Sequence, residues 1–183
     1  MRRGRTRSVV TGIVRGVRRR RGAWERVFST NLTGLFSISR SLMPLLERSA
    51  KPGDPSRIIN IGSMVGTLPI ADNAYSYATS KAAVHHLTRI LANEFAHRSV
   101  NINAIAPGPF RTRMTEYALG EDADQAHAAS NVPVGRIGEP DDLAAAILFL
   151  CGAGGSFVTG AILPVDGGMS VQARKHMFRG DAL

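Results

Sequence analysis

Apolar residues recur at steps of three and four along three long stretches of the chain, a spacing that places them on one face of an α-helix. The first stretch runs from Ala23 to about Arg48, the second covers residues 75–97, and the third extends from Glu139 to Leu150. Pro140 and the two acids after it are typical of a helix N-terminus. The pattern therefore predicts three long helices, the first with one face buried.

Short apolar runs over residues 57–63, 100–105 and 161–165 have the length and composition of buried strands. They alternate with the three predicted helices, and this alternation predicts an α/β fold with a parallel sheet. Ligands of such sheets bind beyond the carboxyl ends of the strands. Ser63 and the Pro107–Gly108 pair follow the first two strands, so we expect both at that edge.

The connecting segments are polar or rich in glycine. Residues 112–134 are polar, rich in alanine and interrupted by Pro133, which predicts short mobile helices outside the core. The glycines of 152–155 follow a helix, so we interpret them as a helix stop with a loop and not as a phosphate-binding turn. Residues 166–168, Asp-Gly-Gly, are expected to turn the chain out of the last strand.

The composition is that of one globular domain. The chain has 183 residues, of which 44% are hydrophobic. Its single cysteine, Cys151, excludes an internal disulfide and suits the reducing cytoplasm. Cys151 follows an apolar run, so we expect it to be a small buried apolar residue. No apolar stretch approaches the ~20 residues that span a bilayer, so no membrane association is predicted.

The positive charge is concentrated at the start of the chain. Residues 1–22 hold nine of the 23 basic residues and none of the 14 acids, so residues 23–183 carry no net charge. The leader is compatible with a disordered tail, an organellar presequence, a nucleic-acid-binding arm, or residues placed before a truncated enzyme by a misplaced start. We favour the tail and the misplaced start. Because the rest of the chain is neutral overall, no nucleic-acid partner is expected.

Candidate chemistry lies at the start of the second predicted helix. Tyr77 and Lys81 are four residues apart, so they share one helix face, and a nearby cation stabilises a phenolate. The pair is therefore a candidate proton donor and acceptor, although the same spacing is also typical of a solvated helix face. His85 and His86 have no acidic or cysteine partners at metal-ligand spacing, so we interpret them as surface or interface residues and expect no metal site.

Several motifs, in this order and spacing, resemble those of the short-chain dehydrogenase/reductase family over residues 23–172. The motifs are Trp24–Val27, Asn31–Gly34, Ile58–Ser63, Tyr77–Val84, Asn103–Gly108, Thr112, Gly135–Asp142, Thr159–Gly160 and Asp166–Gly168. The resemblance implies the C-terminal part of a Rossmann-type, doubly wound parallel sheet. Residues 23–183 would then be a partial catalytic domain behind the leader.

The resemblance also implies roles for individual residues. Tyr77 would be the general acid for carbonyl reduction, or the base for alcohol oxidation. Lys81 would favour the phenolate and bind the nicotinamide ribose, and Ser63 would polarise the substrate carbonyl. Asn31 would anchor a water that links Lys81 to solvent. The implied cofactor is NADP or NAD, with a slight preference for NADP.

Further implied roles concern the loop after the second strand and the oligomer. Pro107, Gly108 and Thr112 resemble the loop on the nicotinamide side, and residues 112–134 resemble a substrate lid. The implied partner is a small carbonyl or alcohol substrate. A complete enzyme of this family would be expected to form a homo-oligomer.

The sequence departs from the family pattern in two places. Ser63 precedes Tyr77 by fourteen residues, where thirteen is common; this longer loop is similar to that of the rhamnolipid-pathway subgroup of β-ketoacyl reductases. Tyr75 is a rival for the acid role, but six residues separate it from Lys81. The family's glycine-rich phosphate-binding turn and first βαβ units have no counterpart before Trp24, so we expect a truncated chain.

Two functional hypotheses follow. The first is an NAD(P)-dependent oxidoreductase that reduces a 3-oxoacyl-like carbonyl or oxidises an alcohol. The alternative, motivated by the missing glycine-rich turn, is an inactive fragment or a helix-mediated association module that binds no cofactor.

Overall fold

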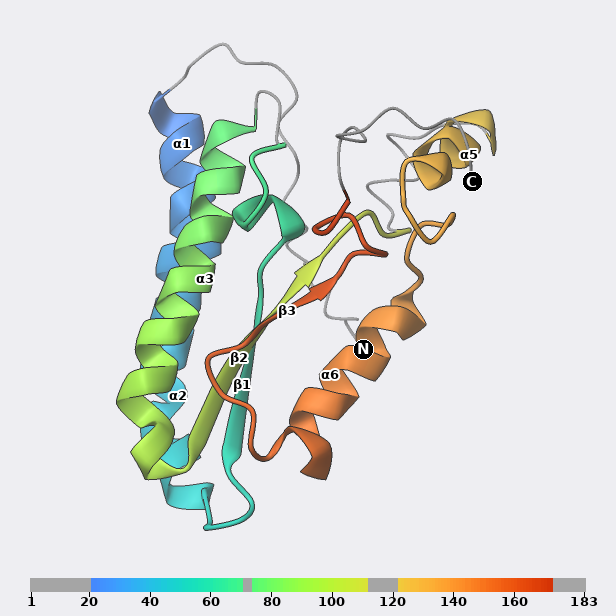
Figure 1. The fold of residues 1–183 in the computed structure, drawn as a ribbon. Helices are drawn as coiled ribbons and strands as arrows, with labels where there is room; N and C mark the ends of the chain where they lie inside the picture. The colour runs from blue at the N-terminus through green and yellow to red at the C-terminus, as the bar shows by residue number, and fades with distance from the viewer. Residues whose placement is uncertain (1–20, 71–73, 112–121, 173–183) are drawn as a thin grey trace, which may run out of the picture.

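The computed structural model describes residues 21–70, 74–111 and 122–172 of the chain (Figure 1). It has helices on both faces of a small parallel sheet. In chain order the elements are α1 (Arg21–Phe28), the π-helix η1 (Ser29–Gly34), α2 (Leu35–Ser49), β1 (Ser56–Ile61), the 3₁₀ helix η2 (Met64–Gly66), α3 (Tyr75–Phe95), the 3₁₀ helix η3 (Ala96–Arg98), β2 (Val100–Pro107), α5 (Asp122–Ser130), α6 (Pro140–Cys151), the 3₁₀ helix η4 (Ala153–Gly155) and β3 (Ile162–Val165). The predicted order of long helices and strands is confirmed.

The sheet is parallel, with the strand order β1-β2-β3. Ile61 pairs with Ile105, and Pro107 pairs with Val165. This register brings the carboxyl ends of all three strands to one edge of the sheet, as the strand pattern predicts. Whatever follows the strands, including Ser63 and Gly108, therefore lies at that edge.

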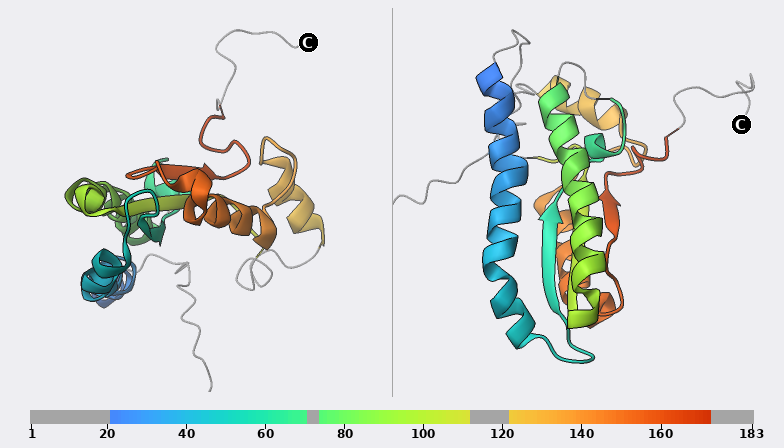
Figure 2. Two further views of the ribbon diagram at one scale, coloured as in Figure 1. Left: turned by 90° about the horizontal axis from the view of Figure 1, so that it is seen from below. Right: turned by 90° about the vertical axis from the view of Figure 1, so that its left-hand side faces the viewer.

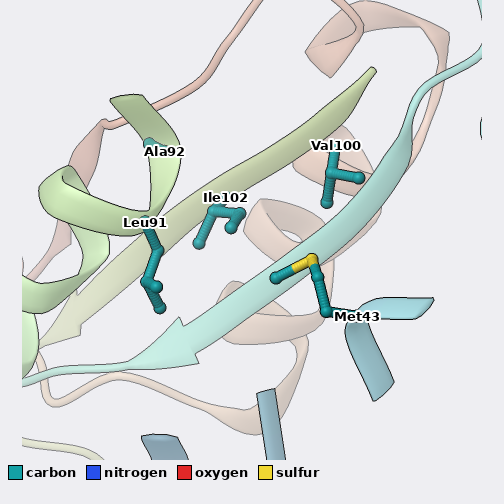
Figure 3. Close-up of a cluster of buried hydrophobic side chains, with 5 residues drawn as sticks. All are labelled: Met43, Leu91, Ala92, Val100 and Ile102. Atoms are coloured by element: carbon teal, nitrogen blue, oxygen red, sulfur yellow. The ribbon is translucent and has the colours of Figure 1, made fainter. Parts of the chain in front are cut away.

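Helices cover the two faces of the sheet (Figures 1 and 2). The continuous rod of α1, η1 and α2 runs beside α3 on one face, and α6 lies on the other. The core between the sheet and the α2/α3 layer contains five buried apolar side chains, shown in Figure 3. They are Met43, Leu91, Ala92, Val100 and Ile102. Val100 and Ile102 alternate along β2, so they point to the same face of the sheet, as the two-residue period of a strand requires.

The first predicted helix forms over its whole length, but its apolar side is only partly buried. The buried residues of η1 and α2 are Asn31, Ser39 and Met43. Ile38 is 62% exposed and Leu45 is 56% exposed, and Trp24, Phe36 and Leu42 are also exposed. The prediction of one buried face is therefore wrong for these five apolar side chains, because no described part of the chain covers that side of the rod.

The third helix also presents apolar residues to solvent. Leu148 is 70% exposed on α6, whereas Leu150 is buried at 1%. Cys151 is exposed as well, so the prediction of a buried thiol is wrong. Its apolar neighbours suggested burial, but Cys151 is the last residue of α6 and its thiol is exposed. Gly152 and η4 then stop the helix, as predicted.

Two buried asparagines of β2 form hydrogen bonds with the segment that leads into β3. The Asn103 amide donates to the Val158 carbonyl at 2.8 Å, and its oxygen accepts from the backbone of Ala161 at 2.9 Å. Asn101 donates to the Ser156 carbonyl at 2.8 Å. These bonds supply hydrogen-bond partners to backbone groups of residues 156–161, which lie outside the strands. They also hold the segment that leads into β3 against β2.

Candidate active site

Asn31 lies inside the π-helical segment η1, where the rod crosses α3. Its side chain is buried and its amide donates to the hydroxyl of Ser80 at 3.0 Å. Ser80 in turn donates to the backbone carbonyl of Tyr77 at 2.8 Å. Single π-turns inside α-helices widen the backbone locally and are frequent at functional sites. The two bonds tie this turn to the segment of α3 that carries Tyr77 and Lys81.

Lys81 is buried, with 8% of its surface exposed, and reaches back to the end of β1. Its ammonium donates to the Ile61 carbonyl at 2.8 Å and lies 5.7 Å from the centre of the Tyr77 ring. Burial lowers the pKa of Lys81 from its ordinary value. The predicted pair therefore shares one helix face, in contact with the strand and not on a solvated surface.

Ser63 follows β1 in extended conformation and begins η2. It is 8% exposed, and its carbonyl accepts from the Gly66 backbone at 2.9 Å. Its backbone N–H donates to Nε2 of His85 at 3.4 Å. The turn after β1 is thus held against α3, on the same side of that helix as Lys81.

His85 corrects one prediction from the sequence. It is 3% exposed, so its interpretation as a surface residue is wrong, whereas His86 is exposed as predicted. The reason lies in its spacing, because His85 is one turn beyond Lys81 and two turns beyond Tyr77, on the face that packs against β1 and η2. That spacing was the signal that would have identified it.

Pro107 and Gly108 lie at the carboxyl end of β2, next to the end of β3. The Gly108 backbone donates to the Val165 carbonyl at 3.0 Å, and a Cβ on Gly108 would come within 2.7 Å of the Asp166 Cα. Only glycine fits this close approach. Thr112, the third residue predicted for this loop, lies outside the described residues.

Asp166 builds the turn after β3, as its Asp-Gly-Gly sequence predicts. Its carboxylate is 7% exposed and accepts from the backbone of Gly168 at 3.0 Å and of Ser170 at 2.9 Å. Gly167 and Gly168 have positive φ angles of 62° and 91°, which favour glycine. The sequence indicated the turn but not the buried carboxylate that organises it.

A cavity of about 340 Å³ opens beside this turn, at the carboxyl ends of β2 and β3. Phe110, Val132 and Val134 provide apolar walls, and Arg136 provides a polar one. The Arg136 guanidinium donates a bidentate pair of hydrogen bonds to the Asp142 carboxylate, at 2.7 and 2.9 Å. Asp142 also accepts from the Glu139 backbone at 2.8 Å, so the start of α6 is fixed to the cavity wall.

The structure therefore brings most of the candidate residues to one edge. Tyr77 and Lys81 contact each other directly, Asn31 is linked to Tyr77 through Ser80, and Ser63 adjoins them through β1 and His85. Pro107 and Gly108 lie at the same edge, at the end of the neighbouring strand β2 and next to the end of β3. The sequence did not identify the Ile61 carbonyl, Ser80 or His85 as parts of the site. Their roles depend on how the helices and strands pack, which a sequence pattern does not show.

The described residues hold neither a candidate metal site nor a membrane-spanning helix. They contain no group of three or more histidine, cysteine or acidic side chains that could hold a metal ion. None of the helices in residues 21–70, 74–111 and 122–172 is both long and apolar enough to cross a membrane.

Comparison with known proteins identifies relatives of this chain. A family model described as "Enoyl-(Acyl carrier protein) reductase" matches residues 12–170. The rhamnolipids biosynthesis 3-oxoacyl-[acyl-carrier-protein] reductase of Pseudomonas aeruginosa is 42% identical over 145 residues, which are 79% of this chain and 57% of that protein. The galactitol 2-dehydrogenase (L-tagatose-forming) of Cereibacter sphaeroides is 43% identical over 150 residues, or 81% of this chain and 57% of the relative.

A solved structure agrees with these matches. The Pseudomonas aeruginosa RhlG/NADP active-site complex superimposes with a TM-score of 0.79 at 41% identity, over 82% of this chain and 60% of that one. The chain thus spans a little under two thirds of the length of these relatives. The predicted resemblance and the predicted Rossmann-type sheet are both confirmed, and the chain belongs to the short-chain dehydrogenase/reductase family.

Proposed function

We propose that the chain is an NAD(P)-dependent oxidoreductase that reduces the carbonyl of a 3-oxoacyl-like substrate, or oxidises the corresponding alcohol. The observation that carries this proposal is the position of the Lys81 ammonium, buried and 5.7 Å from the centre of the Tyr77 ring. A cation so close to the phenol can stabilise the negative charge that develops on the Tyr77 oxygen as its proton is transferred.

In this proposal four residues have defined roles in the reaction. Tyr77 gives its proton to the carbonyl oxygen during reduction, and takes it back in the reverse direction. Lys81 stabilises the phenolate that remains. The Ser63 hydroxyl, at the end of β1, hydrogen-bonds the same carbonyl oxygen and polarises it. Asn31 holds the Tyr77 turn through Ser80 and anchors a water beside Lys81.

The residues present fit a nicotinamide dinucleotide on its ribose side. An ammonium has three N–H donors, and among the described residues Lys81 donates to one acceptor, the Ile61 carbonyl. Two donors are therefore available for ribose hydroxyls. The Pro107–Gly108 turn lies at the strand edge where such ligands bind, and Thr112 would complete that loop. When bound, the dinucleotide supplies the hydride, and NADP is our slight preference because RhlG is described as an NADP complex.

The substrate class rests on the relatives. Two of them are named 3-oxoacyl-[acyl-carrier-protein] reductases, from Pseudomonas aeruginosa and from Vibrio harveyi. The sugar-alcohol dehydrogenase of Cereibacter sphaeroides has similar identity, so polyols form the second substrate class to test. A cytoplasmic location and assembly into a homo-oligomer belong to the same proposal.

A second candidate function is an association module without cofactor. It is favoured by the exposed apolar side chains of the α1–α2 rod, among them Ile38 and Leu45, and by Leu148 on α6. Exposed apolar patches on a helix face often mark a site of protein association. Calorimetric titration of the 183-residue chain with NADPH and NADH separates the two candidates, because saturable binding contradicts the association module and its absence contradicts the oxidoreductase.

Activity is tested by the oxidation of NADPH with a 3-oxoacyl thioester. The Tyr77→Phe variant keeps the ring but removes the proton, so we expect a rate loss of about 10²-fold or more. Tyr75→Phe is the matched control, since Tyr75 is 61% exposed and two residues away on the same helix. Equal turnover by Tyr77→Phe and the unaltered chain would contradict the assigned role.

A further inference from the structure

His85 is enclosed by the turn that carries Ser63. A Cβ on Gly62 would overlap its Nε2 atom, and a Cβ on Gly66 would come within 2.8 Å of its Cε1. The imidazole thus fills the space left by two glycines, one directly before Ser63 and one at the end of η2. No larger residue at either position is compatible with this packing.

The hydrogen bonds of His85 define its tautomer. Nε2 faces the backbone N–H of Ser63 at 3.4 Å, and an N–H can only donate, so Nε2 carries a lone pair. In a neutral imidazole the proton then sits on Nδ1, which lies 3.3 Å from the hydroxyl of Thr67. His85 therefore accepts from one end of the 63–67 turn and donates to the other.

The surroundings keep this imidazole neutral. Burial lowers the pKa of His85, and the charges of Arg89 and Lys81 on the same helix lower it further. The segment packed against it, residues 62–67, contains no titratable side chain, and the nearby group on β2 is the Ile105 carbonyl. No acid in this segment counteracts the two cations, so the lone pair on Nε2 is available at neutral pH.

We propose that His85 is a positioning residue that holds the Ser63–Thr67 turn in place by accepting from the Ser63 backbone and donating to the Thr67 hydroxyl. This inference rests on the proposed function, because Ser63 matters to the reaction only if it binds the carbonyl oxygen. His85 itself touches no reacting atom. Its effect reaches the site through the backbone of Ser63, which sets the direction of the hydroxyl.

Protonation provides a specific signature of this role. A protonated imidazole has no lone pair, so it cannot accept from the Ser63 N–H. The turn should therefore loosen as the pH falls below the ordinary imidazole range, while a glutamine at position 85 should be insensitive to pH. A residue that merely filled space could be replaced by leucine without loss of Ser63 protection at neutral pH.

The experiment measures amide hydrogen exchange of residues 62–68 in the full chain, as protection factors between pH 5 and pH 8. We expect Ser63 protection to fall about tenfold on acidification, and to be low at every pH in His85→Leu. His85→Gln, which offers an oxygen and an N–H to the same partners, should keep protection across the range. His86→Gln is the matched control on the exposed side and should behave as the unaltered chain.

A measurement without substitution covers the case in which a variant does not fold. The ¹⁵N spectrum of the histidine rings should show Nε2 of His85 unprotonated and Nδ1 protonated at neutral pH. A proton on Nε2, or full protection of Ser63 in His85→Leu, would overturn the proposal. Neither readout requires turnover, so a failure of the Tyr77 test would refute the proposed function and leave the result for His85 intact.

If turnover is present, kinetics provide the last readout. His85→Leu should lower kcat more than it raises KM, because the hydroxyl of Ser63 acts on the carbonyl oxygen as charge develops there. His85→Gln should restore kcat. An unchanged kcat in His85→Leu would contradict a positioning role for this residue.

Discussion

The side-chain amide of Asn31 donates to the hydroxyl of Ser80 across 49 positions of sequence, and both residues are buried. The Ser80 hydroxyl in turn donates a hydrogen bond to the backbone carbonyl of Tyr77. A polar contact between two helices thus fixes the helical turn from which Tyr77 and Lys81 project.

Removal of either partner should destabilise the fold. Ser80→Ala leaves the buried Asn31 amide without its acceptor, and we expect a loss of about 1–3 kcal/mol in the free energy of unfolding, measured by urea denaturation. A double-mutant cycle with Asn31→Ala isolates the pair, and its coupling energy should be about 1 kcal/mol. Additive single and double variants would contradict the contact.

The turn after β1 should tolerate no added methyl group. In Gly62→Ala the new Cβ would meet His85 and come within 2.9 Å of the Ile105 carbonyl, and backbone cannot move aside cheaply. We expect a loss of about 1–3 kcal/mol, again by urea denaturation. Gly154→Ala is the control, because its Cβ meets only the half-exposed ring of Phe149, at 3.2 Å. Equal stability of the two variants would refute the packing of His85.

Stability should fall with acidification because of His85. Its pKa is lower in the folded chain than in the unfolded chain, chiefly through burial, so the unfolded chain binds this proton first. The stabilisation is complete above the ordinary imidazole pKa and is lost as the pH falls towards the lowered value. The slope for one proton cannot exceed about 1.4 kcal/mol per pH unit. Urea midpoints of the unaltered chain and His85→Gln measure it, and the variant should lose this part of the slope.

Asp166 should matter more than an exposed acid. Asp166→Asn keeps one acceptor oxygen for two backbone donors, so one N–H of the half-buried turn loses its partner. We expect a loss of about 1–3 kcal/mol by thermal unfolding. Asp54→Asn serves as control, since the Asp54 side chain is 76% exposed and its bond to Arg57 is a surface pair. A destabilisation as small as that of the control would show that the carboxylate does not organise the turn.

Periodicity was sufficient to predict the framework of this fold. The three long helices, the three strands and their parallel order follow from apolar spacing, and the edge at which Ser63 and Gly108 lie follows from the strand order. Family motifs identified the Tyr77–Lys81 pair, which the structure brings into contact with β1.

Burial was predicted less well, for physical reasons. Apolar composition alone cannot say which side of a helix finds a partner, so Cys151 and the apolar side of the α1–α2 rod were wrongly placed inside. His85 was wrongly placed at the surface or in an interface because no partner for it could be identified in the sequence. The space that admits it is created by Gly62 and Gly66, some twenty residues away in sequence.

The central claim is that Tyr77 transfers a proton in an NAD(P)-dependent reaction, and one assay tests it most directly. NADPH oxidation with a 3-oxoacyl thioester is followed for the 183-residue chain, Tyr77→Phe and Tyr75→Phe. We expect turnover by the chain and by Tyr75→Phe, and a loss of about 10²-fold or more in Tyr77→Phe. Undiminished turnover in Tyr77→Phe, or no turnover in any of the three, would contradict it.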